Sequence, residues 1–481
     1  MKRLFAILTL LAVILTGCAN NGKGIAHFER SESFEVLLDA VNAEHEAEKI
    51  FAGEYESYIV KPVEGVKNFN ANDHHHAASQ YFKDDKALTP FEVNRDIETL
   101  YQLLRTRYGC YEYFGGDAAF RAAIDAVIED CGKGMRTTCG ELVESIEKHF
   151  SFVKDAHFTI NGHQMGKYEV PFFYRTVDYI KTESGYETLD GKIVASVDGF
   201  VDMPVALDDL FKRSLTKKGE IVYYPIWLDS FSYEELTSGS VRCVVPELTV
   251  RYTDGTSDTL KADSYTFGNY SKASESVKIQ EKNGIPSVTV NQFYYQNGGM
   301  QFVHSAANYR DRDILIVDLR ECRGGTISMV SNWFTGYTQK EVWGNSTYLD
   351  LGKLDPLYRN HASRPEEEFV PLDNVLIVLT SKLTASASEG FVDMGYNLEN
   401  TLFVGENTHG YRTGNLDYWT LPASGMSVTF GQLLRLYPNS DYFQEYRGFY
   451  PDIWCPADEA KEAVMNFIAK NTTVTYEEAE K

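Results

Sequence analysis

The clearest signal of the fold is the segment Val375-Leu-Ile-Val-Leu-Thr-Ser-Lys-Leu-Thr-Ala-Ser-Ala-Ser-Glu-Gly390. It begins as an apolar run of strand length, and a helix is expected to start at Ala385 or Ser386. A serine at such a transition lies at the positive end of the helix, where free backbone N–H groups stabilise an oxyanion. The stretch therefore predicts an α/β fold. Its serines, Ser386 and Ser388, are candidate nucleophiles or simple helix caps, and the Gly-x-Ser-x-Gly elbow of α/β-hydrolases is absent.

Three further apolar runs of strand length lie on either side of this stretch, at Ser287 to Phe293, Asp313 to Leu319 and Thr401 to Val404. Such strands, separated by helical segments, are typical of a parallel sheet that is buried on both faces. Asp417 to Leu421 and Ser427 to Leu436 flank a turn and predict a hairpin. This part of the chain is therefore expected to be an α/β core with a largely parallel sheet.

Helix signals begin sharply earlier in the chain. Thr89-Pro90-Phe91-Glu92 is a capping box with proline at the first helical position, and Gly109 ends the periodic run that follows. A second helix is expected from about Asp117 to Cys131, and a third from Thr138 to about Phe150. These three segments predict a small helical bundle.

The pattern changes again over residues 167–265, which we call the insert. A strand is expected at 192–197 and an amphipathic helix near 203–215. Residues 247–252 and 257–262 flank a Thr-Asp-Gly-Thr turn and predict a hairpin. This order of elements fits a divergent PDZ-like module, and it fits another small α+β insert equally well.

Length and charge limit the function. The chain has 481 residues and a formal net charge of −23, from 46 Lys and Arg against 69 Asp and Glu. At about 100–200 residues per domain, this length predicts about two to four domains. An acidic surface repels phosphate backbones, and the sequence contains no local basic patch that would overcome this repulsion. We therefore expect no nucleic-acid partner.

The cysteines and clustered histidines do not predict a metal site. Seven cysteines are too few for a scaffold of this length built on disulfides, and no Cys-x-x-Cys pair is present. Cys110, Cys131 and Cys139 lie near predicted helix ends, and a local disulfide among them is compatible with an exported protein. The adjacent side chains of His74-His75-His76 point apart and favour a solvated loop. We expect no metal and no organic cofactor.

The first residues of the chain predict export. Lys2 and Arg3 precede the apolar run from Leu4 to Leu15, which is shorter than the roughly 20 residues of a membrane-spanning helix. The sequence Leu15-Thr16-Gly17-Cys18 that follows resembles the lipobox of bacterial lipoproteins. This resemblance implies removal of residues 1–17, a lipid on Cys18, and a body held to a membrane of the bacterial cell envelope, outside the cytoplasm. An ordinary signal peptide with an incidental cysteine is the alternative.

Four motifs in order carry a wider resemblance. The stretch at 375–390 is preceded by Asp318-Leu-Arg-Glu-Cys-Arg-Gly-Gly325 and followed by Gly405-Glu-Asn-Thr-His-Gly410 and Gly448-Phe-Tyr-Pro-Asp-Ile453. In this order and spacing they resemble the C-terminal processing (tail-specific) serine proteases and their tricorn-core relatives, over about residues 285–455. The resemblance implies a crotonase/ClpP-like α/β core and a serine endopeptidase that cleaves polypeptides.

Within this resemblance the family nucleophile matches Ser386, and Ser388 does not. The resemblance implies attack by Ser386 on the scissile carbonyl and an acyl-enzyme intermediate. The oxyanion hole would be the backbone N–H of Ala387 together with that of Gly324 or Gly325, because a double glycine lets the backbone approach a reacting carbonyl closely.

The general base departs from the most common family pattern. The position at which many members carry a lysine base is Tyr411, followed by Arg412, and neither side chain is a neutral base near pH 7. The resemblance to the tricorn-like branch, which uses histidine, implies His157 as the base and Glu445 as the residue that orients it. His409 is the rival base.

We therefore predict a lipid-anchored serine endopeptidase with a Ser-His-Glu triad. The alternative is a catalytically inactive relative that acts as a peptide-binding or solute-binding lipoprotein. The expected parts are a signal peptide at 1–17, a tether and irregular segment at 18–87, a helical bundle with the histidine turn at 88–165, a PDZ-like or other insert at 167–265, a catalytic core at 275–470 and a tail at 471–481.

Overall fold

The computed structural model describes residues 25–47, 56–58, 82–134, 136–199, 205–238, 246–265, 267–268, 275–296, 298–350, 359–360 and 369–477. Residues 1–17, Cys18, the histidines at 74–76 and Cys243 lie outside the described residues, so the expectations that rest on them stay predictions.

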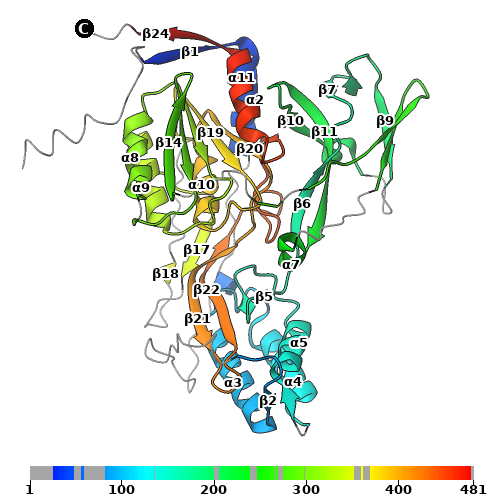
Figure 1. Cartoon of the computed structure of the whole chain (residues 1–481), viewed down its shortest axis with the longest axis vertical. Helices are drawn as coiled ribbons and strands as arrows, with labels where there is room; N and C mark the ends of the chain where they lie inside the picture. The colour runs from blue at the N-terminus through cyan, green and yellow to red at the C-terminus, as the bar shows by residue number, and fades with distance from the viewer. Residues whose placement is uncertain are drawn as a thin grey trace, which may run out of the picture.

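A large mixed sheet forms the centre of the molecule (Figure 1). Its strands run parallel from β15 to β10, which confirms the α/β class and the largely parallel sheet. In sheet order the strands are β14 (Val277–Lys282), β15 (Ile285–Val290), β16 (Ile314–Asp318), β19 (Val375–Thr380), β20 (Thr401–Gly405), β23 (Ile453–Trp454), β10 (Phe211–Leu215), β11 (Ile221–Phe231), β7 (Tyr179–Thr182) and β8 (Gly185–Thr188), and β6 (Tyr168–Phe173) pairs with β11.

Helices cover both faces of the parallel strands. Leu315 and Val317 of β16 pack in one apolar cluster with α8 (Met300–Tyr309), α9 (Ile327–Thr338) and α10 (Ala387–Gly395). Ile314 and Ile316, which point to the other face, pack in a second cluster with α2 (Glu32–Ala47) and α11 (Ala460–Asn471). Burial on both faces explains why these strands read as continuous apolar runs.

The helical bundle packs against a second sheet at the lower end of Figure 1. Its helices are α3 (Pro90–Arg107), α4 (Gly116–Cys131) and α5 (Cys139–His149), and the predicted capping boxes at Thr89 and Thr138 are present. The sheet contains β4 (Thr159–Ile160), β5 (His163–Gln164), β17 (Thr347–Asp350), β18 (Arg359–Asn360), β21 (Thr413–Thr420) and β22 (Ser427–Leu436), and shorter elements are η1 (Glu56–Tyr58), β2 (Ala87–Leu88) and β3 (Thr137–Thr138). The hairpin β21–β22, expected inside the catalytic core, therefore shares its core with the bundle.

The insert differs from expectation in one element. The predicted helix near 203–215 is wrong, because α6 spans only Leu207–Leu210 and the chain continues as strand β10. This strand lies between β23 and β11 in the large sheet, and hydrogen bonding on both edges outweighs the helical apolar pattern. The predicted hairpin is confirmed as β12 (Leu248–Tyr252) and β13 (Ser257–Leu260), next to β9 (Val194–Asp198), and α7 (Tyr233–Thr237) follows β11.

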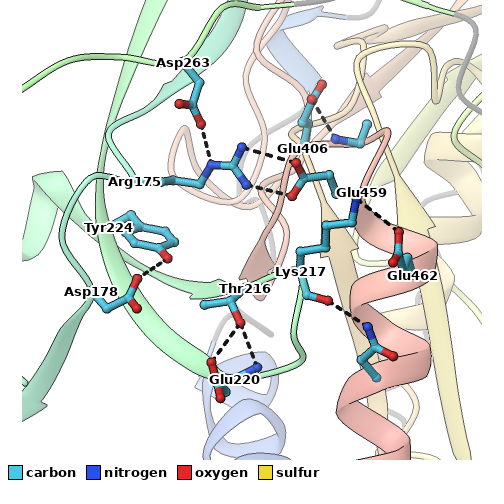
Figure 2. Close-up of polar contacts among 12 residues, drawn as sticks. Arg175, Asp178, Thr216, Lys217, Glu220, Tyr224, Asp263, Glu406, Glu459 and Glu462 are labelled. Carbon is cyan, nitrogen blue, oxygen red and sulfur yellow. Dashed lines mark hydrogen bonds and ion pairs between the residues drawn. The ribbon is translucent and has the colours of Figure 1, made fainter.

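Ion pairs fasten the insert to the core. Figure 2 shows the Arg175 guanidinium between two carboxylates, that of Asp263 and that of Glu459, with 2.7 Å between Arg175 Nη1 and Glu459 Oε2. In the turn between β10 and β11, Lys217 Nζ lies 3.3 Å from Glu462 of helix α11. The insert is therefore bound to the large sheet by backbone hydrogen bonds between strands, and it is bound to α11 and the residue before it by ion pairs.

Both chain ends are more regular than predicted. The segment expected to be an irregular tether contains β1 (Ala26–Arg30) and α2, and the expected tail contains β24 (Thr472–Tyr476). β1 and β24 pair in antiparallel register, and Phe34 and Val41 of α2 are fully buried under the large sheet. The prediction of an irregular N-terminal segment was wrong for β1, because this strand obtains its hydrogen bonds from β24 at the opposite end of the chain.

The described cysteines Cys110, Cys131, Cys139, Cys322 and Cys455 are buried free thiols, so the local disulfide considered above is not formed. Within the described ranges, no helix is long and apolar enough to cross a membrane. The same part of the chain contains no group of His, Cys, Asp or Glu side chains arranged to hold a metal ion.

Candidate active site

Ser386 lies between β19 and α10, at the N-cap position of the helix. It is partly exposed, whereas every other residue from 381 to 398 is buried. Its φ of +57° is in the left-handed region, which is a strained conformation for a residue other than glycine. Its backbone N–H donates to Glu389 Oε2 at 3.0 Å. The fold thus presents one hydroxyl to solvent at the positive end of a buried helix.

Ser388 is not accessible. Its side chain is fully buried, and its hydroxyl donates to the backbone oxygen of Cys322 at 2.8 Å. This hydrogen bond ties α10 to the loop that carries the double glycine. Of the two serines, Ser386 is therefore the accessible one, and it also occupies the N-cap position of α10.

The double-glycine loop packs directly against the serine. A Cβ atom on Gly324, whose φ is +97°, would lie 2.7 Å from Ser386 Cβ and 3.0 Å from the Ala387 nitrogen. Gly325 has a φ of +132° and is the exposed member of the pair. The loop is held by a buried ion pair, in which Arg320 Nη2 donates to Asp318 Oδ2 at 2.7 Å. The structure thus brings together the residues predicted to form the oxyanion hole.

Replacing Gly324 by alanine is expected to slow covalent modification of Ser386 by about 100-fold, because the new Cβ displaces Ser386 and the Ala387 N–H. The rate of reaction with a fluorophosphonate probe measures this effect. Gly134→Ala is the matched control, since no atom lies within 4 Å of a Cβ at that position. Equal rates for Gly324→Ala and the wild type would exclude Gly324 from the oxyanion site.

His157 lies in the turn between α5 and β4, and a hydroxyl bridges its ring to a carboxylate. Nδ1 is 3.0 Å from Thr413 Oγ1, and Thr413 Oγ1 donates its hydrogen to Asp155 Oδ1 at 3.0 Å. Because that hydrogen is already used, Nδ1 must carry the proton of the ring, and Nε2 keeps its lone pair. This is the tautomer that a general base needs.

The surroundings keep this imidazole neutral. Burial first, and the charge of Arg435 second, lower the pKa of His157 to about 3. The carboxylate behind it is also buried: Asp155 accepts hydrogen bonds from the His157 backbone N–H and from the Tyr108 hydroxyl, at 2.9 Å and 2.8 Å. No local sequence pattern indicates that Thr413 or Tyr108 contacts this carboxylate.

Glu445 does not hold the histidine ring as predicted. Its Oε1 accepts from the Ala156 backbone N–H and its Oε2 from the Arg412 backbone N–H, each at 2.8 Å. The ring nitrogen that a triad carboxylate would bind is bound by Thr413 instead. Burial, together with the charge of Asp155, raises the pKa of Glu445 well above its usual range. Glu445 satisfies two buried N–H groups, one beside His157 and one beside Tyr411.

Tyr411, at the position of the family lysine, connects the serine to the histidine. Its ring packs on His157 with 3.8 Å between ring centroids, and its backbone N–H donates to Glu389 Oε2, the oxygen that also accepts from Ser386. Burial raises the pKa of the phenol, so Tyr411 is not a base. In the described residues no hydrogen bond joins the Ser386 hydroxyl to His157.

The rival base His409 is enclosed. Its Nδ1 lies 2.7 Å from the Lys382 carbonyl oxygen and donates to it, while Nε2 is buried and has no hydrogen-bond partner among the described residues. The ring packs against Tyr168 and Tyr411, at 4.4 Å and 4.3 Å between centroids. His157 is therefore the better candidate for a base.

Comparison with known proteins defines the class. A partly exposed serine at a helix N-terminus, a glycine loop against it and a neutral imidazole packed on Tyr411 are groups of the kind that serine hydrolases use. Residues 284–454 match the model of peptidase family S41. The match covers the segment that holds Ser386 and the double glycine, and it supports a serine peptidase related to this family.

Solved structures are similar to the chain at low identity. A putative peptidase from Parabacteroides merdae is 16% identical, with 79% of this chain and 97% of that chain covered and a TM-score of 0.40. Mature CPAF is 12% identical, with 81% and 99% covered and a TM-score of 0.42. The photosystem II D1 C-terminal processing protease is 13% identical, with 78% and 96% covered and a TM-score of 0.36. No curated protein matches the chain. With every TM-score below 0.5, these likenesses carry no argument about the site.

Proposed function

We propose that this protein is a lipid-anchored endopeptidase outside the cytoplasm, with Ser386 as nucleophile and His157 as base. Ser386 Oγ attacks the scissile carbonyl, and His157 Nε2 takes the serine proton and passes it to the leaving amine. The backbone N–H of Ala387 and one from the Gly324–Gly325 pair bind the oxyanion, and water then hydrolyses the acyl-enzyme. The observation that carries this proposal is the single accessible, strained serine in an otherwise buried segment.

The acid partner of the base differs from the predicted triad. We propose that two hydrogen bonds orient His157. The Asp155 carboxylate fixes the Thr413 hydroxyl, and that hydroxyl accepts the hydrogen bond from His157 Nδ1. Glu445 stays in the proposal as a positioning residue, because it fixes the backbone on either side of the His157–Tyr411 contact.

A fluorophosphonate probe tests the function. Purified protein lacking the signal segment should gain the mass of one probe, and peptide mapping should place that mass on Ser386. A folded protein that stays unmodified, or is modified elsewhere, would favour the second candidate, an inactive relative that binds peptides. That candidate is supported by Tyr411 at the lysine position and by the missing hydrogen bond between Ser386 and His157.

The plot of kcat/KM against pH should begin to fall only at an unusually low pH. A protonated imidazole cannot accept the serine proton, so kcat/KM falls only as the pH drops through the folded pKa of His157, which is about 3. We therefore expect nearly constant kcat/KM between pH 7 and pH 5, where an unperturbed histidine would cause a loss of about 30-fold. Circular dichroism at each pH verifies folding, since stability falls below pH 6.5 as the unfolded chain gains a proton that the native site excludes. An acid limb near pH 6.5 would exclude His157 as the base in this environment.

The fold and the anchor complete the proposal. We infer that the parallel strands with helices on both faces form a crotonase/ClpP-like core, and that the insert is a PDZ-like module that captures an extended substrate segment by strand addition.

The proposed lipid anchor can be tested with a Cys18→Ser variant expressed in bacteria, which should move from the membrane fraction to the soluble fraction of the envelope. Wild type and variant in the same fraction would contradict lipidation at Cys18.

A further inference from the structure

A buried lysine joins the loops of the proposed site. Lys382 lies between β19 and Ser386 and is fully buried. Its ammonium group donates to three backbone carbonyl oxygens, at 2.7 Å from Thr408, 2.7 Å from Tyr446 and 3.1 Å from Arg447. Its own carbonyl oxygen accepts the hydrogen bond from His409.

The three carbonyls belong to two segments that border the site. Thr408 lies in the loop after β20, which leads to Tyr411 and its contact with His157. Tyr446 and Arg447 directly follow Glu445, which holds the backbone beside His157 and beside Tyr411. Lys382 itself belongs to the segment that ends at Ser386. One ammonium group thus fixes the nucleophile segment to both segments that set the position of the base.

An ammonium group suits this arrangement better than any neutral side chain. It offers three donors and no lone pair, and it meets three carbonyl oxygens. A neutral amine has two donors and a lone pair, so one carbonyl would face a lone pair and lose its partner. A buried polar group that loses a partner disturbs the local structure at a cost of about 1–3 kcal/mol.

A different role, as general base, is also open to a buried lysine beside a serine. Burial lowers the pKa of Lys382 to about 7, as in a serine–lysine dyad. The geometry opposes this role, because all three hydrogens of the ammonium group are directed at carbonyl oxygens and not at Ser386. The two roles predict opposite pH dependence, since a base must be neutral and a three-way clamp must be charged.

We propose that Lys382 is a positioning residue of the peptidase, and that its charged form clamps the His157–Tyr411 side of the site to the nucleophile segment. This inference rests on the proposed function of Ser386 and His157. Because the clamp needs the charged ammonium group, the inference predicts that the active arrangement of the site is lost at alkaline pH. The groups that face the ammonium are Glu389 on α10, Glu169 and the Tyr168 ring on β6, Glu406 and His409 in the loop after β20, and Arg447.

The first measurement is the pH dependence of kcat for the wild-type protein on a fluorogenic peptide. The clamp predicts constant kcat from pH 5 to about 7 and a fall above that range. A rise of kcat through the same range would identify Lys382 as the base and overturn the clamp. A flat profile would overturn it as well. This measurement needs no variant, so it stays informative even if substitutions prevent folding.

The second measurement uses Lys382→Met, which keeps the length of the side chain and removes the donors, and Lys382→Arg, which keeps a cation at all accessible pH values. The clamp predicts that Lys382→Met lowers kcat by about 10- to 100-fold, changes KM less than about threefold, and loses the alkaline fall. Lys382→Arg should also lack the fall. Lys340→Met, at an exposed lysine after α9, is the matched control and should keep the wild-type profile.

The two proposals fail in distinguishable ways. A folded wild-type protein that hydrolyses no peptide and takes no probe at Ser386 removes the proposed function. A wild-type protein that is active, beside a Lys382→Met variant with wild-type kcat and an unchanged alkaline fall, removes the clamp and leaves the proposed function standing.

Discussion

Ser386→Ala is expected to lower kcat for peptide hydrolysis by about 10⁴- to 10⁶-fold, because it removes the hydroxyl oxygen that we propose as the nucleophile. The protein should stay folded, since Ser386 is partly exposed and its structural hydrogen bond is made by its backbone N–H, which alanine retains. Progress curves with a fluorogenic peptide at high enzyme concentration measure the residual rate. Thermal unfolding followed by circular dichroism checks the fold.

Ser388→Ala is the matched control for this prediction. It removes a buried hydroxyl that donates to the Cys322 carbonyl oxygen, so its main effect should be a loss of stability of about 1 kcal/mol, with kcat lowered less than about tenfold. The reverse result, an active Ser386→Ala protein and an inactive but folded Ser388→Ala protein, would move the nucleophile to Ser388.

His157→Ala should have the second largest effect, a fall in kcat of about 10²- to 10⁴-fold, because serine attack then proceeds without a positioned base. Thr413→Val should lower kcat by about 10- to 100-fold, since it removes the hydroxyl that selects the Nδ1–H tautomer. If Thr413 acts only through His157, the double variant should be no slower than His157→Ala alone. Steady-state kinetics on all three proteins test this dependence.

The control for the base is His163→Ala, an exposed histidine paired with Glu147, for which wild-type kinetics are expected. Additive effects of Thr413→Val and His157→Ala would show that Thr413 supports the site by another route. A His157→Ala protein with wild-type kcat would remove His157 as the base. The enclosed His409 would then be the next candidate.

Part of the site is encoded in short stretches of sequence. The apolar run at 375–379 followed by small residues predicted both a buried strand and the helix whose N-cap is Ser386. The double glycine at Gly324 and Gly325 predicted a close backbone approach, and the structure places that backbone against Ser386. These predictions succeed because strand and helix periods, caps and glycine geometry depend on residues that are near one another in sequence.

Other parts could not be predicted in this way. Asp155 and Thr413 are 258 positions apart, and nothing near either residue indicates that a hydroxyl bridges that carboxylate to His157. β10 carries an amphipathic pattern that favours a helix, yet two strands distant in sequence hold it extended. β1 lies in the segment that was predicted to be irregular and β24 lies in the predicted tail, and neither strand has a pairing partner within its own segment.

The α/β class, the helical bundle, the strand and helix that flank Ser386 and the family resemblance could all be predicted from the sequence, because they depend on local periodicity and on motifs in order along the chain. Three features became clear only in the folded chain: Ser386 is the accessible serine, Thr413 and Asp155 contact the histidine where Glu445 was expected, and Lys382 is buried among three carbonyl groups. The physical reason is that accessibility, tautomer and charge at one residue are set by groups from other segments, and these meet only when the chain has folded.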